Sequence, residues 1–201
     1  MAIVINGSGT VTGLAVGGLP DGTVDSGTLA TDSVVAAKLG TDAVTADALK
    51  SDAITGADLP AGSVLQVVSN TQTSQVTITS TSYTDTGFTS SITPSSTSSK
   101  VLVLFSSVGG GTRNGAENDN QFGLTRDNGS NFLTVKRTEQ YDYGGDGSVL
   151  RMPFNINYLD SPSSTNAVTY KVYGKMNNAT QALMGSSSGS ITEFILMEIA
   201  G

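Results

Sequence analysis

Apolar residues recur every five positions along the first third of the chain. From Leu19 to Val64 each fifth residue is Leu, Val or Ile, and from Val24 onward β-branched residues alternate with Leu, so the full unit is ten residues. Steps of five would scatter these side chains around a helix and place them on alternate faces of a strand. Neither regular element would gather these apolar side chains on one side, so the repeat is expected to contain a bend, or its Leu and Val to face different neighbours.

Three architectures are compatible with this spacing. A single-chain pentapeptide β-solenoid would point the residue two before each apolar position inward, where Asp32, Asp42, Asp47 and Asp52 stand. Buried unpaired carboxylates are costly, which disfavours the solenoid. A disordered linker has no reason to keep register. Parallel chains in register around one axis would bury each Leu and Val against its copies, and this is the arrangement that we favour.

The favoured arrangement assigns a trimer axis to the periodic positions. The axis residues are Leu19, Val24, Leu29, Val34, Leu39, Val44, Leu49, Ile54, Leu59 and Val64. Turn signals bracket the repeat, since "LPDGT" precedes it and "LPAGS" closes it. We therefore expect an N-terminal segment over residues 1–19, a decapeptide-repeat stalk over 20–62 and a C-terminal domain over 63–201.

The remainder of the chain reads as an all-β domain. Short runs rich in Val, Ile, Thr, Tyr and Phe, several of them alternating with polar residues, are separated by Gly, Ser, Asn and Pro. About nine strands at this spacing indicate a β-sandwich or barrel. The expected strands lie at 63–69, 74–80, 100–108, 121–126, 131–137, 149–160, 167–176, 182–187 and 191–200. The last is largely apolar, so we expect it at the centre of its sheet or at an interface.

Two long polar segments, 109–120 and 138–148, are expected to be loops, and binding residues often lie on loops held by a rigid sandwich. Aromatic rings beside carboxylates and glycines can stack on a sugar and hydrogen-bond to it. The alternative interpretation is a mobile hairpin tip with a Tyr packing inward. The candidate receptor or glycan residues are Arg113, Asn114, Asn118, Tyr141, Asp142, Tyr143 and Asp146.

Composition narrows the chemistry. The chain lacks Cys, His and Trp. It therefore has no thiolate nucleophile and no histidine, which is the commonest general base. A net charge of −7 disfavours nucleic acid and anionic membranes as partners. No stretch of about 20 apolar residues predicts a membrane span, and the N-terminus has no Sec signal pattern. We expect no enzyme activity, no cofactor and no resident metal.

The remaining polar motifs give only weak evidence for a catalytic, metal-binding or modification site. Glu139, Asp142 and Asp146 supply carboxyls for a glycosidase pair, but spacing in a Gly-rich segment fixes no distance between them. Oxygen ligands for Ca²⁺ occur at 117–120 and 142–147 without EF-hand spacing, so solvated loop acids are expected instead. The "NAT" sequon at 178–180 is not expected to be modified in a bacterial product.

The motifs "AIVINGSGTVTGLAVGGLPDGTV", "DAVTADALKSDAITGADLPAGSVLQVV", "SSKVLV", "LDSPSSTNAVTYKV" and "LMEIAG" resemble short fibre proteins of tailed bacteriophages, marine and cyanobacterial ones especially. The resemblance covers essentially the whole chain. It implies a homotrimer with a trimeric shaft, a C-terminal jelly-roll knob and an N-terminal segment that docks on another virion protein. The anchoring residues would be Ile3, Val4, Ile5, Val11 and Leu14.

The sequence thus predicts a virion structural protein, a surface appendage of a phage particle. Its partners would be its own copies, a tail, baseplate or capsid protein, and a host-surface glycan or outer-membrane component. Two alternatives stay open. One is a head fibre or capsid decoration protein without a receptor role, and the other is a polysaccharide depolymerase.

Overall fold

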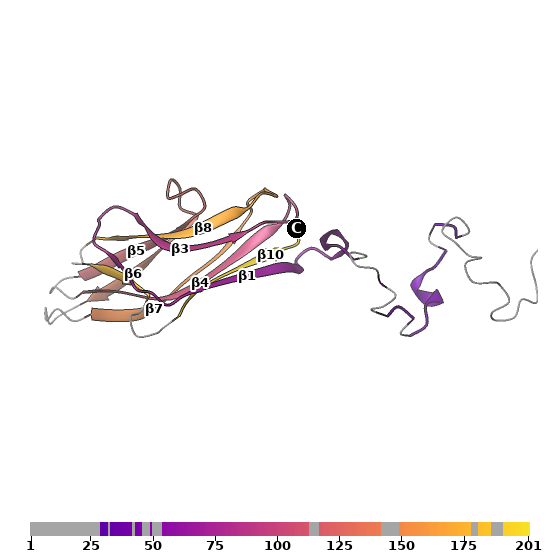
Figure 1. Cartoon of the computed structure of the whole chain (residues 1–201), viewed down its shortest axis with the longest axis horizontal. Coiled ribbons are helices and arrows are strands. Elements are labelled where there is room, and N and C mark those ends of the chain that lie inside the picture. Colours follow the sequence, from indigo (N-terminus) through magenta and orange to yellow (C-terminus); the bar gives the residue numbers. More distant parts are fainter. Residues whose placement is uncertain are drawn as a thin grey trace, which may run out of the picture. The chain divides into compact units, whose positions relative to one another are not determined.

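The computed structural model describes residues 29–31, 33–41, 43–45, 49, 54–112, 117–141, 149–177, 181–185 and 191–201. The chain divides into two compact units, Met1–Ala53 and Ile54–Gly201. The second unit therefore includes the last turn of the repeat as well as the strands (Figure 1). No helix among the described residues has the length and apolar character needed to cross a membrane.

The backbone of the repeat turns once every five residues wherever the structure describes it. The amides of Ser33, Lys38, Ala43, Asp58 and Ser63 bond to the carbonyls of Ala30, Val35, Gly40, Thr55 and Pro60, at N–O distances of 2.8–3.1 Å. Two of these turns are short 3₁₀-helices, η1 (Ala36–Lys38) and η3 (Gly56–Asp58). The bend that a period of five requires is confirmed.

Ten strands form the rest of the described chain. They are β1 (Val64–Gln72), β2 (Val76–Ile78), β3 (Thr84–Ile92), β4 (Lys100–Thr112), β5 (Glu117–Thr125), β6 (Thr134–Tyr141), β7 (Val149–Asp160), β8 (Val168–Met176), β9 (Ala182–Met184) and β10 (Thr192–Ile199). Nine of the ten coincide with an expected strand. The tenth, β3, was not expected, because its sequence TDTGFTSSI is dominated by Thr and Ser.

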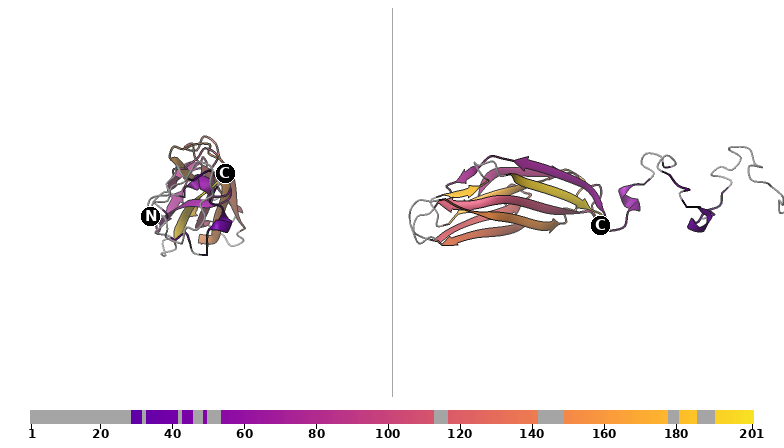
Figure 2. Two further views of the ribbon diagram at one scale, coloured as in Figure 1. Left: turned by 90° about the vertical axis from the view of Figure 1, so that its right-hand side faces the viewer. Right: turned by 90° about the horizontal axis from the view of Figure 1, so that it is seen from below.

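The strands form two antiparallel sheets that pack as a β-sandwich (Figures 1 and 2). One sheet has the order β1-β10-β4-β9-β2, with β7 paired to the other side of β4. The second sheet has the order β3-β8-β5-β6. The C-terminal strand β10 lies between β1 and β4, so the expectation of a central last strand is confirmed.

Alternation along the strands builds the core between the sheets. On β4 the side chains of Val101, Val103 and Phe105 are at most 1 % exposed, while the residues between them face outward. The Phe105 ring contacts the rings of Phe88, Phe154 and Phe194 edge-on, with centroids 5.8, 6.2 and 5.3 Å away. Edge-to-face contacts of this kind add to the free energy gained by burial. Residues from both sheets therefore converge on one aromatic centre.

A buried polar contact links the two sheets. The hydroxyl of Tyr170 on β8 donates to a carboxylate oxygen of Asp160 on β7 at 2.8 Å, and the two residues are 0 % and 5 % exposed. The Arg126 guanidinium lies 3.4 Å from the same carboxylate. Burial, above all, and the bond to Asp160 raise the pKa of Tyr170. The phenol therefore stays protonated and remains a donor.

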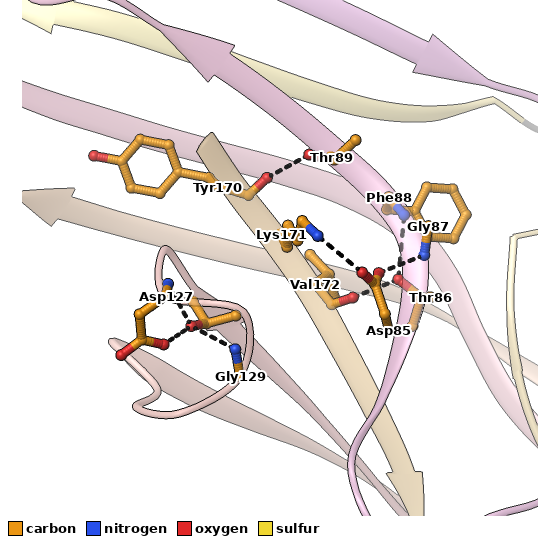
Figure 3. A network of polar contacts seen from close by, with 11 residues as sticks. Asp85, Thr86, Gly87, Phe88, Thr89, Asp127, Gly129, Tyr170, Lys171 and Val172 are labelled. Atoms are coloured by element: carbon orange, nitrogen blue, oxygen red, sulfur yellow. Dashed lines mark hydrogen bonds and ion pairs between the residues drawn. The ribbon is translucent and has the colours of Figure 1, made fainter. Parts of the chain in front are cut away.

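A bulge in β3 explains how a polar strand joins the core. Gly87 has φ +78°, a conformation that favours glycine, and the pairing of β3 with β8 shifts register between Asp85 and Thr89. The Asp85 carboxylate accepts the Gly87 amide at 2.8 Å and lies 3.1 Å from the Lys171 amine (Figure 3). The hydroxyl of Thr86 donates to the Val172 carbonyl at 2.5 Å. Side-chain bonds thus replace the ladder bonds that the bulge removes.

The basal end of the sandwich, where Val64 pairs with Ile199 and Ile199 with Lys100, is fixed around a buried carboxylate. Glu198 is 1 % exposed and accepts from the amide and hydroxyl of Ser95 at 2.7 and 2.6 Å and from the Gln66 amide group at 2.6 Å. Burial raises the pKa of Glu198, but these hydrogen bonds outweigh it and the net pKa is lowered. Glu198 therefore ties the segment before β4 to strands β1 and β10.

The turn after β5 closes on another carboxylate. Asp127, labelled in Figure 3, accepts from the Thr125 hydroxyl at 2.6 Å. It also accepts from the Asn131 amide at 2.9 Å. Asn128 and Gly129 have φ of 58° and 87°, which suits Asn and Gly in a tight turn. Hydrogen bonds from Asn131 and Thr125 lower the pKa of Asp127 to about 2.

Replacement of Tyr170 by Phe should lower the free energy of unfolding by about 1.5–3 kcal/mol, because it removes a buried hydrogen bond to a charged acceptor. Tyr158→Phe is the matched control, since Tyr158 is only partly buried against the same core. Urea denaturation of both variants measures the difference. Equal losses in the two variants would contradict the role given to the Tyr170–Asp160 bond.

Acid should weaken the turn after β5. Because the folded pKa of Asp127 is depressed to about 2, its stabilising effect is complete above the unfolded pKa near 3.8 and is lost as the pH falls through 2. The difference in melting temperature between the parent and Asp127→Asn should therefore shrink between pH 5 and pH 2. Carboxyl NMR should give an Asp127 midpoint near pH 2, and a midpoint near 3.8 would contradict the turn geometry.

Candidate functional site

The two segments expected to be long loops lie at the same end of the sandwich, opposite the basal end. Thr112 at the end of β4 pairs with Val149 at the start of β7, and Glu117 at the start of β5 pairs with Tyr141 at the end of β6. We call this the distal end. Figure 1 shows the ends of β5 and β6 far from the C-terminus. The fold therefore brings together two segments that are separate in the sequence.

The boundaries of both predicted loops were wrong. Strand β4 continues through Thr112 and strand β5 begins at Glu117, so only residues 113–116 of the predicted 109–120 loop remain between strands. Strand β6 likewise runs to Tyr141, which shortens the predicted 138–148 loop. Polar and glycine-rich sequence is compatible with strand here because neighbouring strands pair along its length.

Two of the seven candidate receptor residues lie on described strands. Asn118 pairs with Gln140, and Tyr141 pairs with Glu117, so both are at the distal end of the β5–β6 ladder. The other five, Arg113, Asn114, Asp142, Tyr143 and Asp146, lie outside the described residues. The receptor role of all seven stays a prediction.

An ion pair between the buried carboxylate of Asp119 and the exposed guanidinium of Arg137 supports the distal end and was missed from the sequence. Asp119 on β5 is 4 % exposed, and the Arg137 guanidinium on β6 donates to it through Nε at 3.1 Å and through Nη2. Asn177, just after β8, donates its side-chain amide to Asp119 at 2.7 Å and its backbone amide to the Asp119 carbonyl at 2.8 Å. Three segments therefore meet at one carboxylate.

The Asp119 carboxylate is not the solvated loop acid that its sequence context suggests. The hydrogen bond from Arg137 lowers the pKa of Asp119 most, and the bond from Asn177 adds to this, while burial opposes both. Arg137 also lies 3.3 Å from the exposed Glu139 carboxylate. No sequence signal could identify this pairing, because Asp119 and Arg137 meet only through the register of β5 and β6.

An aromatic and polar group covers the outer face of the second sheet next to this ion pair. The Phe132 ring lies over Gly123, where a Cβ would come within 2.3 Å of the ring. Its centroid is 4.3 Å from the ring of Tyr83, and the Lys175 amine is 5.1 Å from the Tyr83 centroid. The Tyr83 hydroxyl donates to the Gln121 side chain at 3.0 Å. Stacking and hydrogen-bonding groups thus stand side by side below the distal end.

A hollow lies at the basal end of the sandwich. It has a volume of about 450 Å³ and is lined by the last turn of the repeat, including Thr55 and Leu59, and by a serine-rich segment, including Ser95 and Ser99. The amide of Gly62 bonds to the Ala200 carbonyl at 2.8 Å beside it. This hollow therefore lies where the last turn of the repeat meets the sandwich, at the end opposite Asn118 and Tyr141.

The eight described axis positions are exposed although all are apolar. Leu29, Val34, Leu39, Val44, Leu49, Ile54, Leu59 and Val64 are 47, 53, 45, 52, 42, 59, 40 and 52 % exposed. Leu19, Val24 and the anchoring residues Ile3, Val4, Ile5, Val11 and Leu14 lie outside the described residues. A solenoid would cover such side chains within one chain, and the described part of the repeat does not.

The described residues assemble no candidate for catalysis or metal binding. Within them no three His, Cys, Asp or Glu side chains are close enough to hold a metal ion together. Of the acids considered for a glycosidase pair, Glu139 lies beside Arg137, and Asp142 and Asp146 lie outside the described residues.

No protein-family model and no curated protein matches the chain. Among solved structures, the VP2 subviral particle of infectious bursal disease virus matches with 14% identity and a TM-score of 0.33, over 68% of this chain and 33% of that chain. The T=1 particles derived from infectious bursal virus match with 12% identity and a TM-score of 0.33, over 67% and 36%. The chain thus spans about a third of the length of each, and TM-scores of this size support no conclusion about its function.

Replacement of Arg137 by Gln should leave Asp119 buried with a weaker partner and lower the free energy of unfolding by about 1–3 kcal/mol at neutral pH. The pKa of Asp119 should rise in this variant, so the loss should shrink as the pH falls below about 4. Chemical denaturation at several pH values measures both effects.

Lys136→Gln on the same strand is the control, and as an exposed substitution it should change stability by less than about 0.5 kcal/mol. A loss in Arg137→Gln that is the same at pH 3 and pH 7 would show that the Asp119 charge is not what Arg137 stabilises.

Proposed function

We propose that the chain is a structural protein of a bacteriophage virion, a homotrimeric fibre. Residues 1–19 attach it to another virion protein, the repeat forms the trimeric stalk, and the sandwich forms the knob. The knob's distal end contacts a host-surface glycan or outer-membrane component. The resemblance of the repeat and of the C-terminal motifs to phage fibre proteins motivates this assignment.

One observation carries the proposal. Eight described apolar side chains, spaced by five, remain 40–59 % exposed, and the backbone turns at the same interval. A regular turn presents the apolar residue of each unit in an equivalent position. Burial of a Leu or Val side chain is worth roughly 1.5–3 kcal/mol. Copies in register would gain this free energy at each five-residue position, which a single chain leaves exposed.

The arrangement of the sandwich supports a contact role for its distal end. The repeat enters the sandwich through Gly62 and Ser63, which bond to Ala200 at the basal end. The candidate receptor segments leave from the opposite end, at Thr112 and Tyr141. A fibre anchored through its N-terminus thus presents these segments outward. Three knobs on each fibre would raise avidity above the affinity of a single site.

The oligomeric state tests the proposal. Light scattering after size exclusion should give about three times the chain mass of 20.5 kDa. Leu39→Asp with Val44→Asp should dissociate the trimer, because it places three buried carboxylates in each of two layers. The β-sheet signal in circular dichroism should persist, because neither residue belongs to the sandwich unit.

Ala37→Asp with Thr41→Asp is the control pair, since both residues are exposed and lie off the five-residue positions. This pair should leave the mass of the assembly unchanged. An antibody raised against the sandwich should decorate an appendage of intact particles. A parent protein that is monomeric at micromolar concentration would overturn the fibre proposal.

A further inference from the structure

The outer face of the first sheet carries apolar side chains, and two of them, Val67 and Leu159, are more than half exposed. Inward-facing residues on β4 are Val101, Val103 and Phe105, so Leu102 and Leu104 between them face outward. In an antiparallel sheet directly paired residues share a face. The register therefore identifies every outward neighbour of these two leucines.

Directly paired residues form rows across the outer face, running from β1 through β10 and β4 to β7. Two of these rows contain only apolar or uncharged polar residues. The first row is Val67, Met197, Leu102 and Leu159, and the second is Ser69, Ile195, Leu104 and Asn157. Val67 and Leu159, at the two ends of the first row, are 56 % and 51 % exposed. We call these eight residues the basal face, because they lie next to the basal end.

Charge limits the basal face on both sides. Lys100 pairs with Ile199 on the side of the basal end, and Glu193 pairs with Ser106 one row beyond the second row. Between these two charges the face has none. A chain with a net charge of −7 is repelled by its own copies over most of its surface, and this uncharged area is where copies approach at least cost.

The outer face of the second sheet differs. Phe132 and the turn around Gly129 cover part of it, with Gly129 against the Tyr173 ring. The uncovered part carries ionic groups, such as the Lys171–Asp85 pair at 3.1 Å. An uncharged, uncovered apolar area of several strands is therefore specific to the first sheet, and such areas mark interaction sites in soluble proteins.

We propose that the basal face packs against two further copies of this chain around a threefold axis, so that the sandwich has its own trimer contact in addition to the repeat. The inference rests on the homotrimer of the proposed function. Continuity identifies copies of the chain as the occupant. Val64 is both the last five-residue position of the repeat and the first residue of β1, and it pairs with Ile199 directly below the first row.

Threefold symmetry then fixes which strands meet. Strands β1 and β7 are the two edges of the first sheet at this level, because β1 pairs only with β10 and β7 only with β4. When three such faces surround an axis, the β1 edge of each copy meets the β7 edge of the next. Val67 of one copy therefore packs near Leu159 of its neighbour, while Met197 and Leu102 face the axis.

Cross-linking tests this geometry cleanly, because the chain has no cysteine. Val67→Cys with Leu159→Cys in one full-length chain should give covalent trimers with a bismaleimide linker of about 8 Å. The linker is shorter than the roughly 14 Å that three strand spacings put between β1 and β7, so it does not join the two cysteines of one copy. The control pair is Val67→Cys with Val135→Cys, since Val135 is 40 % exposed on the second sheet. It should give no covalent trimer.

Charge insertion is the second measurement. Leu159→Glu and Val67→Glu should each raise the concentration at which the trimer half-dissociates by about tenfold or more. Val135→Glu, at an apolar position that is 40 % exposed and away from the basal face, should leave this concentration unchanged. Circular dichroism confirms that each variant is folded.

The outcomes separate the two proposals. A trimeric parent whose Val67/Leu159 cysteine variant stays uncross-linked, and which tolerates both glutamates, overturns the basal-face contact and leaves the fibre proposal standing. Covalent dimers without trimers overturn the threefold arrangement in favour of paired faces. A monomeric parent overturns the fibre proposal together with this contact.

Discussion

The sandwich and the repeat differ in how they remove apolar side chains from water. In the sandwich, alternation with a period of two gives each sheet one apolar face, and the two faces cover each other around Phe105. In the repeat, a period of five gives each unit one apolar side chain and no partner within the described chain. The sandwich core meets the requirement to bury apolar side chains within one chain, and the described part of the repeat does not.

Buried polar contacts fix the details that hydrophobic burial leaves open. An apolar core tolerates shifts of one sheet over the other, but the Tyr170–Asp160 bond has a single geometry that joins β8 to β7. Glu198 does the same for β1, β10 and the segment before β4. A carboxylate that has lost its water is stable only where its donors are in place. These contacts therefore select one arrangement among several that would bury similar area.

The sequence predicts the elements of the sandwich well because alternation is a local signal. Val168, Tyr170 and Val172 identify β8 without knowledge of its neighbours. Strand β3 is not predicted by alternation. Only Phe88 and Ile92 among its nine residues are large and apolar. The other inward positions are occupied by Thr86 and Ser90. Its strand character depends on pairing with β8, which lies about 80 residues away in the sequence.

Pairing also explains why the candidate site was predicted only in outline. Polar, glycine-rich sequence at 109–120 resembles a loop, yet β7 and β9 pair with Gly109–Gly111 and make it strand. The Asp119–Arg137 ion pair and the meeting of the two distal segments follow from register, which a single sequence does not encode locally.

The basal face is another feature that local sequence patterns do not predict. The sequence alone predicts ordinary core positions for three apolar strand residues, Leu102, Met197 and Leu159. Only the register of the strands shows that they lie together on the outer face of the sheet. Val64, three residues before Val67 in the sequence, still follows the five-residue spacing of the repeat. In the row of Val64 the apolar residues continue on β1 and β10 through Val64 and Ile199, and Lys100 on β4 ends them. Under the proposed trimer an apolar contact between the knobs of different copies would matter, because copies joined only through the repeat would be free to separate where the repeat ends.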